Sequence, residues 1–200
     1  MLNVYLLRHG ETQWNADGNR YCGRTNIALT PKGIAQAELV REQLKHIHFD
    51  AVYSSPLERA LRTAQIASGK DDVTTDERLI EFNFGKWEGK TKEEFIPENP
   101  ALWNRWCDDP GITNAGITGE TANEVVDRVN NFFEFALQKF SPGNILVVGH
   151  NGINRFYLAS KLGMPLKNYR RLVQLNSSIT MFSLDPKNGE LSLKHLNSRF

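Results

Sequence analysis

Two short apolar runs of this sequence each lead into a histidine, and both histidines stand within two residues of a glycine. Residues 4–7 lead into Arg8-His9-Gly10, and residues 144–149 lead into His150-Asn151-Gly152. Short runs of branched apolar residues are typical of buried strands. Because open α/β sheets bind ligands beyond the carboxyl ends of their strands, a cation and an imidazole at this point suit an anionic ligand. If the two strands are parallel neighbours, His9 and His150 lie close together.

The segments between these runs alternate between strand and helix patterns. Thr30-Pro31 has the N-cap threonine and first-turn proline of a helix start, and an apolar stripe follows at spacings of three and four. A second strand over residues 51–53 ends at Ser54-Ser55-Pro56, where a second helical stripe starts. Strand–turn–helix repeats argue for βαβ units and a parallel sheet. The predicted fold is therefore α/β, a three-layer α/β/α sandwich with a mostly parallel central sheet.

The other expected elements follow the same patterns. They are a weak strand within residues 73–79, a long helix from Thr121 to about Phe140, a helix over residues 153–162, and a terminal hairpin of residues 179–184 and 191–196. The edge of this terminal hairpin either offers a surface for a homodimer or is covered by other parts of the chain. The sequence leaves both alternatives open.

Residues 82–119 interrupt the regular pattern with prolines, glycines and three tryptophans. Thr91 and Glu94 have the spacing of a capping box, which predicts short helices inside the segment. We interpret the segment as an insertion over the sheet edge, of the kind that often forms a lid or a specificity wall. Trp87, Trp103 and Trp106 either line a pocket or form the core of this insertion. The whole chain, residues 1–200, is expected to form a single domain.

Composition limits the classes of partner. A chain of 200 residues with a formal net charge of +1 gives no reason to expect nucleic acid or a membrane as partner. No stretch resembles a signal peptide or approaches the roughly 20 apolar residues of a membrane span, so a cytoplasmic location is expected. Cys22 and Cys107 are far apart and have no metal-ligand spacing.

Several motifs together resemble one family. Arg8-His9-Gly10-Glu11-Thr12 followed by Trp14-Asn15 resembles the signature of the histidine phosphatase superfamily, in its phosphoglycerate-mutase-like branch. Residues 54–60, 79–89 and 149–152 resemble further motifs of that family, so the resemblance covers nearly the whole chain.

The resemblance implies roles for five catalytic residues. His9 corresponds to the nucleophile that forms a covalent phosphohistidine, and His150 to the histidine that donates to the phosphoryl oxygens. Arg8 and Arg59 correspond to phosphate-binding arginines, for which guanidinium geometry is suited. Glu81 corresponds to the proton donor, and we expect burial and the nearby phosphate to raise its pKa.

The resemblance also implies a binding role for three further residues. Asn15, Gly23 and Asn151 are expected to complete the phosphate site, with Gly23 acting through its backbone amide. Glu88 is interpreted as structural. The family chemistry uses neither a metal nor a cofactor, so the expected partner is a small phosphorylated metabolite.

The same site could hydrolyse a phosphate or transfer it back to a sugar acid. Phosphoglycerate mutases have a tyrosine where this chain has Phe84, and an arginine pair within the segment that here contains only Arg105. Arg170-Arg171 lies outside that segment. These departures favour a phosphatase that acts on small phosphomonoesters, with 2,3-bisphosphoglycerate-dependent phosphoglycerate mutase as the alternative. A non-catalytic phosphate-binding scaffold is a third, disfavoured hypothesis, because all five catalytic residues are present.

Overall fold

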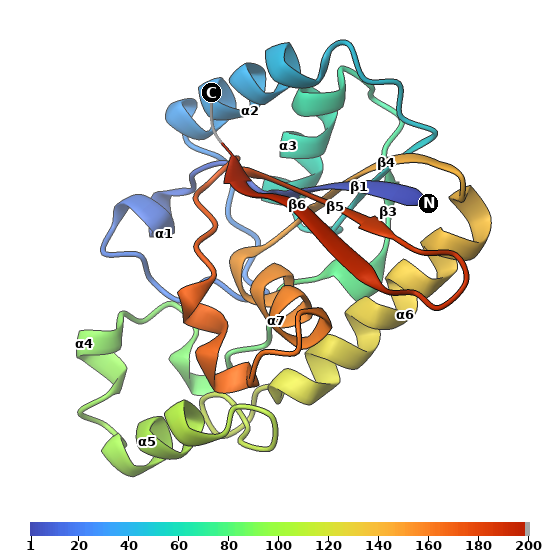
Figure 1. The fold of residues 1–200 in the computed structure, drawn as a ribbon. Coiled ribbons are helices and arrows are strands. Elements are labelled where there is room, and N and C mark those ends of the chain that lie inside the picture. Colours follow the sequence, from blue (N-terminus) through green and yellow to red (C-terminus); the bar gives the residue numbers. More distant parts are fainter. Residues whose placement is uncertain (199–200) are drawn as a thin grey trace.

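A computed structural model describes residues 1–198 and has one six-stranded mixed sheet (Figure 1). The strand order is β3-β2-β4-β1-β5-β6; the first four strands are parallel, and β5 and β6 are antiparallel to their neighbours. The strands are β1 (Leu2–Arg8), β2 (Ala51–Ser54), β3 (Thr74–Thr75), β4 (Gly143–Gly149), β5 (Ile179–Leu184) and β6 (Leu191–Ser198). The α-helices are α1 (Gln13–Ala16), α2 (Pro31–Leu44), α3 (Glu58–Ser68), α4 (Lys92–Phe95), α5 (Pro100–Asp108), α6 (Ala122–Phe140) and α7 (Asn151–Lys161). Three 3₁₀ helices are η1 (Glu77–Leu79), η2 (Gly85–Trp87) and η3 (Leu166–Arg171).

The sheet has an apolar core on each face, which confirms the three-layer architecture. Leu6 and Val147 belong to the core that contains α6 and α7, whereas Leu7 and Val148 belong to the core that contains α2 and α3. Successive strand residues point to opposite faces, so an uninterrupted apolar run is what a sheet covered on both sides requires. Figure 1 shows α2 and α3 above the strands and α6 and α7 below them.

The two helix starts expected from capping patterns are confirmed. Thr30 accepts a hydrogen bond from the Gly33 amide at 3.0 Å, and Pro31 is the first residue of α2. Thr121, where a long helix was expected to begin, forms a capping box with Glu124 at the start of α6. These contacts satisfy amides that have no partner inside the helix.

Two details of the expected elements are wrong. The strand predicted within residues 73–79 is only Thr74–Thr75, because the Asp76 carboxylate accepts from the Arg78 amide at 2.9 Å and starts η1. The apolar stripe assigned to α2 is shorter than expected, since Ile34 is 37% exposed and Ile47 lies beyond the end of the helix. The terminal hairpin is present as β5 and β6.

Residues 82–119 extend the core on the α7 side instead of covering the sheet edge. The expected short helices are present as α4 and α5, and Thr91 with Glu94 forms the predicted capping box. Trp87 and Trp106 are 4% and 1% exposed, and Trp106 packs edge-on against Phe156 of α7. Trp87 and Trp106 therefore belong to the hydrophobic core, and Trp103 is partly buried against it, which agrees with the second of the two interpretations. Aromatic packing anchors this segment beside the carboxyl ends of the strands.

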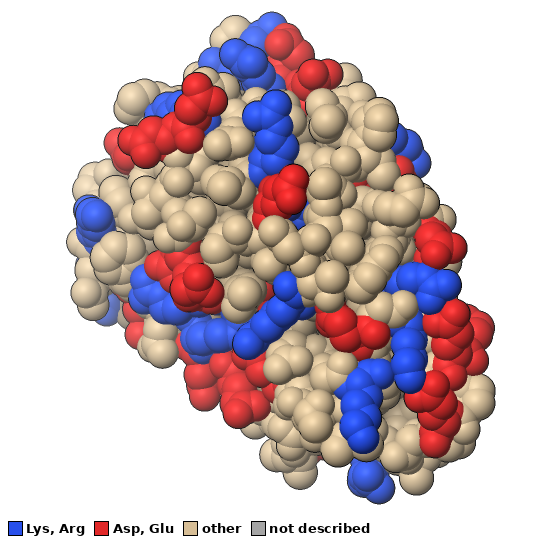
Figure 2. All heavy atoms as spheres, turned by 180° about the vertical axis from the view of Figure 1, so that it is seen from behind, with Lys and Arg blue, Asp and Glu red and all other residues tan. Residues whose placement is uncertain are grey.

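The outer surface carries charges of both signs. On the face seen in Figure 2, Lys and Arg side chains lie among Asp and Glu side chains. None of the helices described within residues 1–198 is long and apolar enough to cross a membrane.

Candidate active site

His9 and His150 lie side by side at the ends of two adjacent parallel strands. Arg8 at the end of β1 is opposite Gly149 at the end of β4, and the His9 amide donates to the Gly149 carbonyl at 3.1 Å. Each histidine directly follows its strand, so this register brings the ring centroids to 5.1 Å. The expectation that strand pairing would bring the two imidazoles together is confirmed.

His9 is held in one tautomer by its own loop. Its Nδ1 lies 2.7 Å from the Gly10 carbonyl, which can only accept, so Nδ1 carries the proton. In the neutral ring the lone pair is then on Nε2. Burial first, and then the charges of Arg59 and Arg8, hold the pKa of His9 well below its usual range. The ring is therefore neutral at physiological pH and has a nucleophilic nitrogen.

His150 is the N-cap residue of α7 and is fully buried. Neither of its ring nitrogens has a hydrogen-bond partner within residues 1–198. Burial, followed by the positive charge of Arg59, lowers its pKa well below the usual value. A buried imidazole without partners is costly, and a bound anion would accept from its N–H.

Arg8 and Arg59 surround the histidines from different elements. Nη1 of Arg8 donates to the Gln174 carbonyl at 2.9 Å. Arg59 stands in the first turn of α3, is fully buried, and donates to the carbonyls of Gly23 at 2.7 Å and Thr25 at 2.9 Å. Its Nε has no partner within the described chain. The positive charges of Arg59 and Arg8 add to burial in lowering the pKa of His9.

Gly23 differs from the expectation. Its amide donates to both carboxylate oxygens of Glu88 at 3.0 Å, and the same carboxylate accepts from the Thr25 amide at 3.0 Å. The Gly23 amide is thus engaged by Glu88 instead of facing the pocket. Glu88 and Arg59 hold this loop from opposite sides, which agrees with the structural interpretation of Glu88. A Cβ at Gly23 would meet Glu88 and the Phe82 carbonyl, so the close approach requires glycine.

Glu81 points its carboxylate at the N-terminus of α7. It accepts from the amides of Phe82 at 2.8 Å, Gly152 at 3.1 Å and Ile153 at 3.2 Å, and only 3% of the residue is exposed. Burial raises the pKa of Glu81, while these amides and the Arg59 charge oppose the rise. The predicted direction of the shift is confirmed, with burial as its cause.

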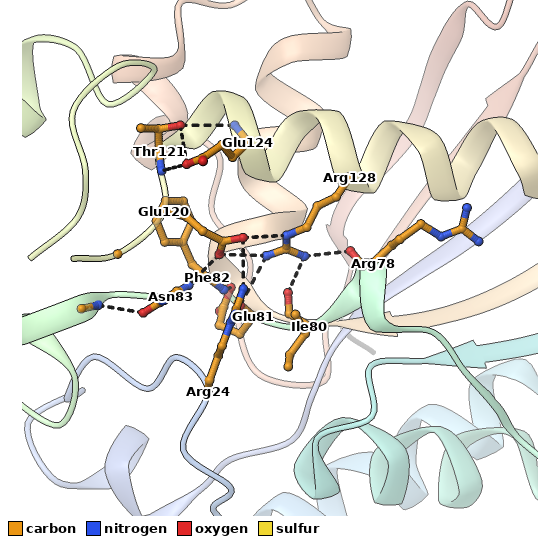
Figure 3. Close-up of polar contacts among 12 residues, drawn as sticks. Arg24, Arg78, Ile80, Glu81, Phe82, Asn83, Glu120, Thr121, Glu124 and Arg128 are labelled. Carbon is orange, nitrogen blue, oxygen red and sulfur yellow. Dashed lines mark hydrogen bonds and ion pairs between the residues drawn. The ribbon is translucent and has the colours of Figure 1, made fainter. Parts of the chain in front are cut away.

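A network that sequence reasoning missed fixes the backbone around Glu81 (Figure 3). Arg128 of α6 donates to the carbonyls of Arg78 at 2.8 Å and Ile80 at 2.7 Å, and it pairs with Glu120 at 3.0 Å. Glu120 in turn accepts from the Asn83 amide at 2.8 Å. In the sequence, Gly119-Glu120-Thr121 with Arg128 resembles another recurrent segment of the family and indicates chiefly a helix start, so this network was not predicted.

A pocket of about 310 Å³ opens over His9. It is lined by five of the expected site residues: Arg8, His9, Asn15, Glu81 and Asn151. Arg59, His150 and Gly23 are not among its lining residues, and Arg59 and His150 are fully buried. Asn15 accepts from the Thr12 amide at 3.1 Å and from the Asn176 side chain at 3.1 Å, so its amide is oriented by the protein.

The pocket also contains cations that were not predicted. Arg20, Lys92, Arg155 and Arg170 line it. Arg155 lies one helical turn after Asn151, a spacing that places both on one face of α7 and was readable from the sequence. Arg170 had been set aside because it lies outside the segment in which a mutase pair is expected. The structure corrects this, since Arg170 in η3 borders the same pocket as His9.

Two further side chains, those of Glu11 and Cys22, carry ligating or reactive groups. Within residues 1–198, no group of three His, Cys, Asp or Glu side chains is placed to hold a metal ion. Glu11 pairs with Lys32 at 2.7 Å. Cys22 lines the pocket, but burial raises the pKa of its thiol to about 11, so the thiol is protonated at neutral pH.

The sequence matches a family along nearly its full length. Residues 4–198 match the family described as "Histidine phosphatase superfamily (branch 1)". The chain belongs to this superfamily. It is a phosphoric monoester hydrolase by family and by its phosphatase relatives, and the resemblance noted from the motifs is confirmed.

Several relatives carry names of specific activities. Phosphoserine phosphatase 1 of Hydrogenobacter thermophilus is 32% identical over 94% of this chain and 89% of its own length. The adenosylcobalamin/alpha-ribazole phosphatase of Salmonella typhimurium is 35% identical over 99% of this chain and 97% of its own length. The 2-carboxy-D-arabinitol-1-phosphatase of Triticum aestivum is 34% identical, but this chain spans only 38% of its length. Probable phosphoglycerate mutases named GpmB, such as that of Citrobacter koseri, are 35% identical over 90% of this chain and 84% of their length.

Solved structures share the fold. Phosphoserine phosphatase from Entamoeba histolytica, as a mutant in complex with phosphoserine, superimposes with a TM-score of 0.89 at 32% identity, covering 99% of this chain and 98% of that one. The same enzyme in complex with 3-phosphoglyceric acid also has a TM-score of 0.89. The mixed sheet flanked by helices is thus the fold of this family.

Proposed function

We propose that this chain is a metal-independent phosphatase that hydrolyses small phosphomonoesters through a covalent phosphohistidine on His9. The observation that carries the proposal is the pairing of His9 and His150, whose ring centroids lie 5.1 Å apart. Both rings are buried and neutral, and the charges of Arg8 and Arg59 act on both. The only nucleophile in this arrangement with an oriented lone pair is Nε2 of His9.

The first step transfers the phosphoryl group. Nε2 of His9 attacks phosphorus, the bond from phosphorus to the ester oxygen breaks, and the protonated carboxyl of Glu81 gives its proton to the leaving oxygen. Charge on the transferring oxygens is stabilised by Arg8, Arg59 and an N–H of His150. The raised pKa of Glu81 keeps the carboxyl protonated to a higher pH than usual.

The second step releases phosphate. Water attacks phosphorus, the Glu81 carboxylate takes a proton from this water, and the bond from phosphorus to Nε2 breaks. His9 is then neutral again, Glu81 is protonated, and inorganic phosphate is the product. No cofactor takes part, and a small phosphorylated metabolite is the proposed partner.

The test measures phosphate release from a panel of phosphomonoesters in the presence of EDTA. We expect release to survive chelation, to vanish in His9→Ala, and to continue in a control variant of the exposed histidine, His46→Ala. A rapid acid-free quench should show a phosphoryl adduct on the parent protein and none on His9→Ala. Phosphate release that EDTA abolishes, or that persists in His9→Ala, would contradict the proposal.

Phosphoglycerate mutase activity is the second candidate. It is favoured by the GpmB relatives and by Arg155 and Arg170 in the pocket, since a mutase must hold a second anionic group of its substrate. Incubation with 3-phosphoglycerate and 2,3-bisphosphoglycerate distinguishes mutase activity from phosphatase activity. Interconversion of phosphoglycerates without phosphate release would replace the phosphatase by the mutase.

A further inference from the structure

The pocket contains three cations that the two chemical steps do not use. Arg155 comes from α7, Arg170 from η3 and Lys92 from the start of α4, and all three line the same cavity as His9. Figure 1 shows α4 and α7 at the same end of the molecule, with the orange-red segment of η3 near them. The three residues are far apart in sequence, so the fold gathers them.

No carboxylate within residues 1–198 pairs with these three cations. Arg155 donates through Nε to the Asn151 carbonyl at 3.0 Å, and Arg170 reaches the Tyr21 hydroxyl at 3.5 Å. Lys92 lies 5.7 Å from the centroid of the Trp103 ring. The fourth added cation behaves differently, because Arg20 pairs with Asp17 and Glu94, each at 2.8 Å.

A buried tyrosine positions the two arginines. The guanidinium carbons of Arg155 and Arg170 lie 4.9 and 4.7 Å from the centroid of the Tyr169 ring. That ring is 4% exposed and stacks on Phe156 with centroids 3.9 Å apart. Contact with an aromatic ring favours the guanidinium charge and does not use up its N–H groups, which stay able to bind an acceptor.

Positive charge in this cluster acts against the charged form of Lys92, although the pKa of Arg170 itself is raised. Burial and then the charges of Arg170 and Arg155 lower the pKa of Lys92, and burial lowers the pKa of Arg155. An anion between these groups would relieve this repulsion. The one carboxylate in the lining, Glu81, is bound by backbone amides of Phe82, Gly152 and Ile153.

We infer that Arg155 and Arg170, with Lys92, form a subsite for a carboxylate on the substrate, so that phosphomonoesters of small carboxylic acids are preferred. The inference rests on the proposed function, because it assumes that the phosphoryl group of the same molecule reaches His9. Planar guanidinium groups bind carboxylates through two parallel hydrogen bonds. A cavity of about 310 Å³ suits an ester of this size.

The test compares two esters that differ at one group. 3-Phosphoglycerate carries a carboxylate where glycerol 3-phosphate carries a hydroxymethyl group, and the readout is the ratio of their kcat/KM values. We expect the parent protein to favour 3-phosphoglycerate by about tenfold or more, the effect of one charge-assisted hydrogen bond. Arg155→Gln and Arg170→Gln should each lower this ratio by a similar factor. Arg171→Gln, at the exposed neighbouring position, should leave it unchanged.

The ratio also distinguishes specificity from folding defects. A variant that is only misfolded loses both activities together and keeps the ratio. A ratio near one in the parent protein, or a ratio that Arg155→Gln and Arg170→Gln leave unchanged, would overturn the subsite. Hydrolysis of p-nitrophenyl phosphate without turnover of either ester would overturn it too. Failure to hydrolyse p-nitrophenyl phosphate would instead contradict the proposed function.

Discussion

In the proposed mechanism, the single carboxyl group of Glu81 donates a proton in the first step and accepts one in the second. Replacing it by Glu81→Gln should slow hydrolysis of an alkyl phosphate by about 10²–10⁴-fold, the usual contribution of general acid–base catalysis. An aryl phosphate has a good leaving group that does not need the proton, so the rate of its first step should fall much less. Burst kinetics with p-nitrophenyl phosphate, beside steady-state rates with glycerol 3-phosphate, measure this difference.

The pH dependence gives the control for this assignment. Activity should fall as pH rises through the raised pKa of Glu81, because the carboxyl group loses the proton that it donates. Activity should also fall as pH drops through the lowered pKa of His9, because the nucleophilic nitrogen becomes protonated. Glu81→Gln should remove the alkaline limb for the alkyl ester. Equal losses for both classes of ester would assign the proton to another group.

Residues that follow strand ends could be located from sequence, because strand pairing alone brings them together. His9 and His150 are of this kind, and Arg59 is placed by the first turn of the next helix. The engagement of the Gly23 amide could not be foreseen, since it depends on a carboxylate 65 residues away. Arg155 and Arg170 were missed because a cation on a helix has the pattern of a solvated face until its neighbours are known.

At the scale of elements, α6 supports the segment that carries Glu81. Arg128→Met would remove donors from the carbonyls of Arg78 and Ile80 and leave Glu120 without this partner. We expect the free energy of unfolding to fall by about 1–3 kcal/mol. The rate of hydrolysis should fall more for the alkyl phosphate than for the aryl phosphate, because Glu81 is displaced. Denaturant titration and the two-ester comparison measure these effects.

Arg24 offers the matched control. It pairs with the same oxygen of Glu120 at 3.1 Å, but its side chain is 45% exposed, whereas that of Arg128 is 18% exposed (Figure 3). Arg24→Met should therefore change stability by less than 1 kcal/mol, as exposed ion pairs do. If Arg128→Met reduced both esters equally, Arg128 would have only a structural role.

For the whole molecule, the buried histidines predict how stability depends on pH. The pKa values of His9 and His150 are lowered in the folded protein, so below about pH 6.5 the unfolded chain binds more protons than the folded one. The contribution of the two histidines to the free energy of unfolding is fully present above that pH and is lost as pH falls. For each histidine, the equilibrium constant for unfolding rises by up to about tenfold per pH unit. Glu81, with its raised pKa, has the opposite sign and loses its contribution as pH rises through its folded value.

Denaturant titration at pH 7.5 and 5.5 in phosphate-free buffer tests this. The double variant His9→Asn, His150→Asn should lose less stability between the two pH values than the parent does, whereas His46→Asn should resemble the parent. An identical loss in the double variant would show that other groups dominate the acid sensitivity.

The layered architecture was predictable because its cause is local, an apolar run that is continuous in each buried strand. The placement of residues 82–119 was not. Its aromatic residues are buried against α7 and η3, and a pattern of prolines, glycines and tryptophans does not say which surface they will meet.

The position of β4 between β2 and β1 has a consequence for biosynthesis. β1 and β2 leave the ribosome early, yet the strand that joins them begins only at Gly143. Until then the nascent chain exposes the edges of both strands to other polypeptides, and His150 does not yet exist beside His9. Such late, distant pairing makes folding slow and dependent on protection of those edges. His150 is synthesised only after about three quarters of the chain, so a ribosome that stops earlier produces a chain that lacks one of the two histidines of the proposed site.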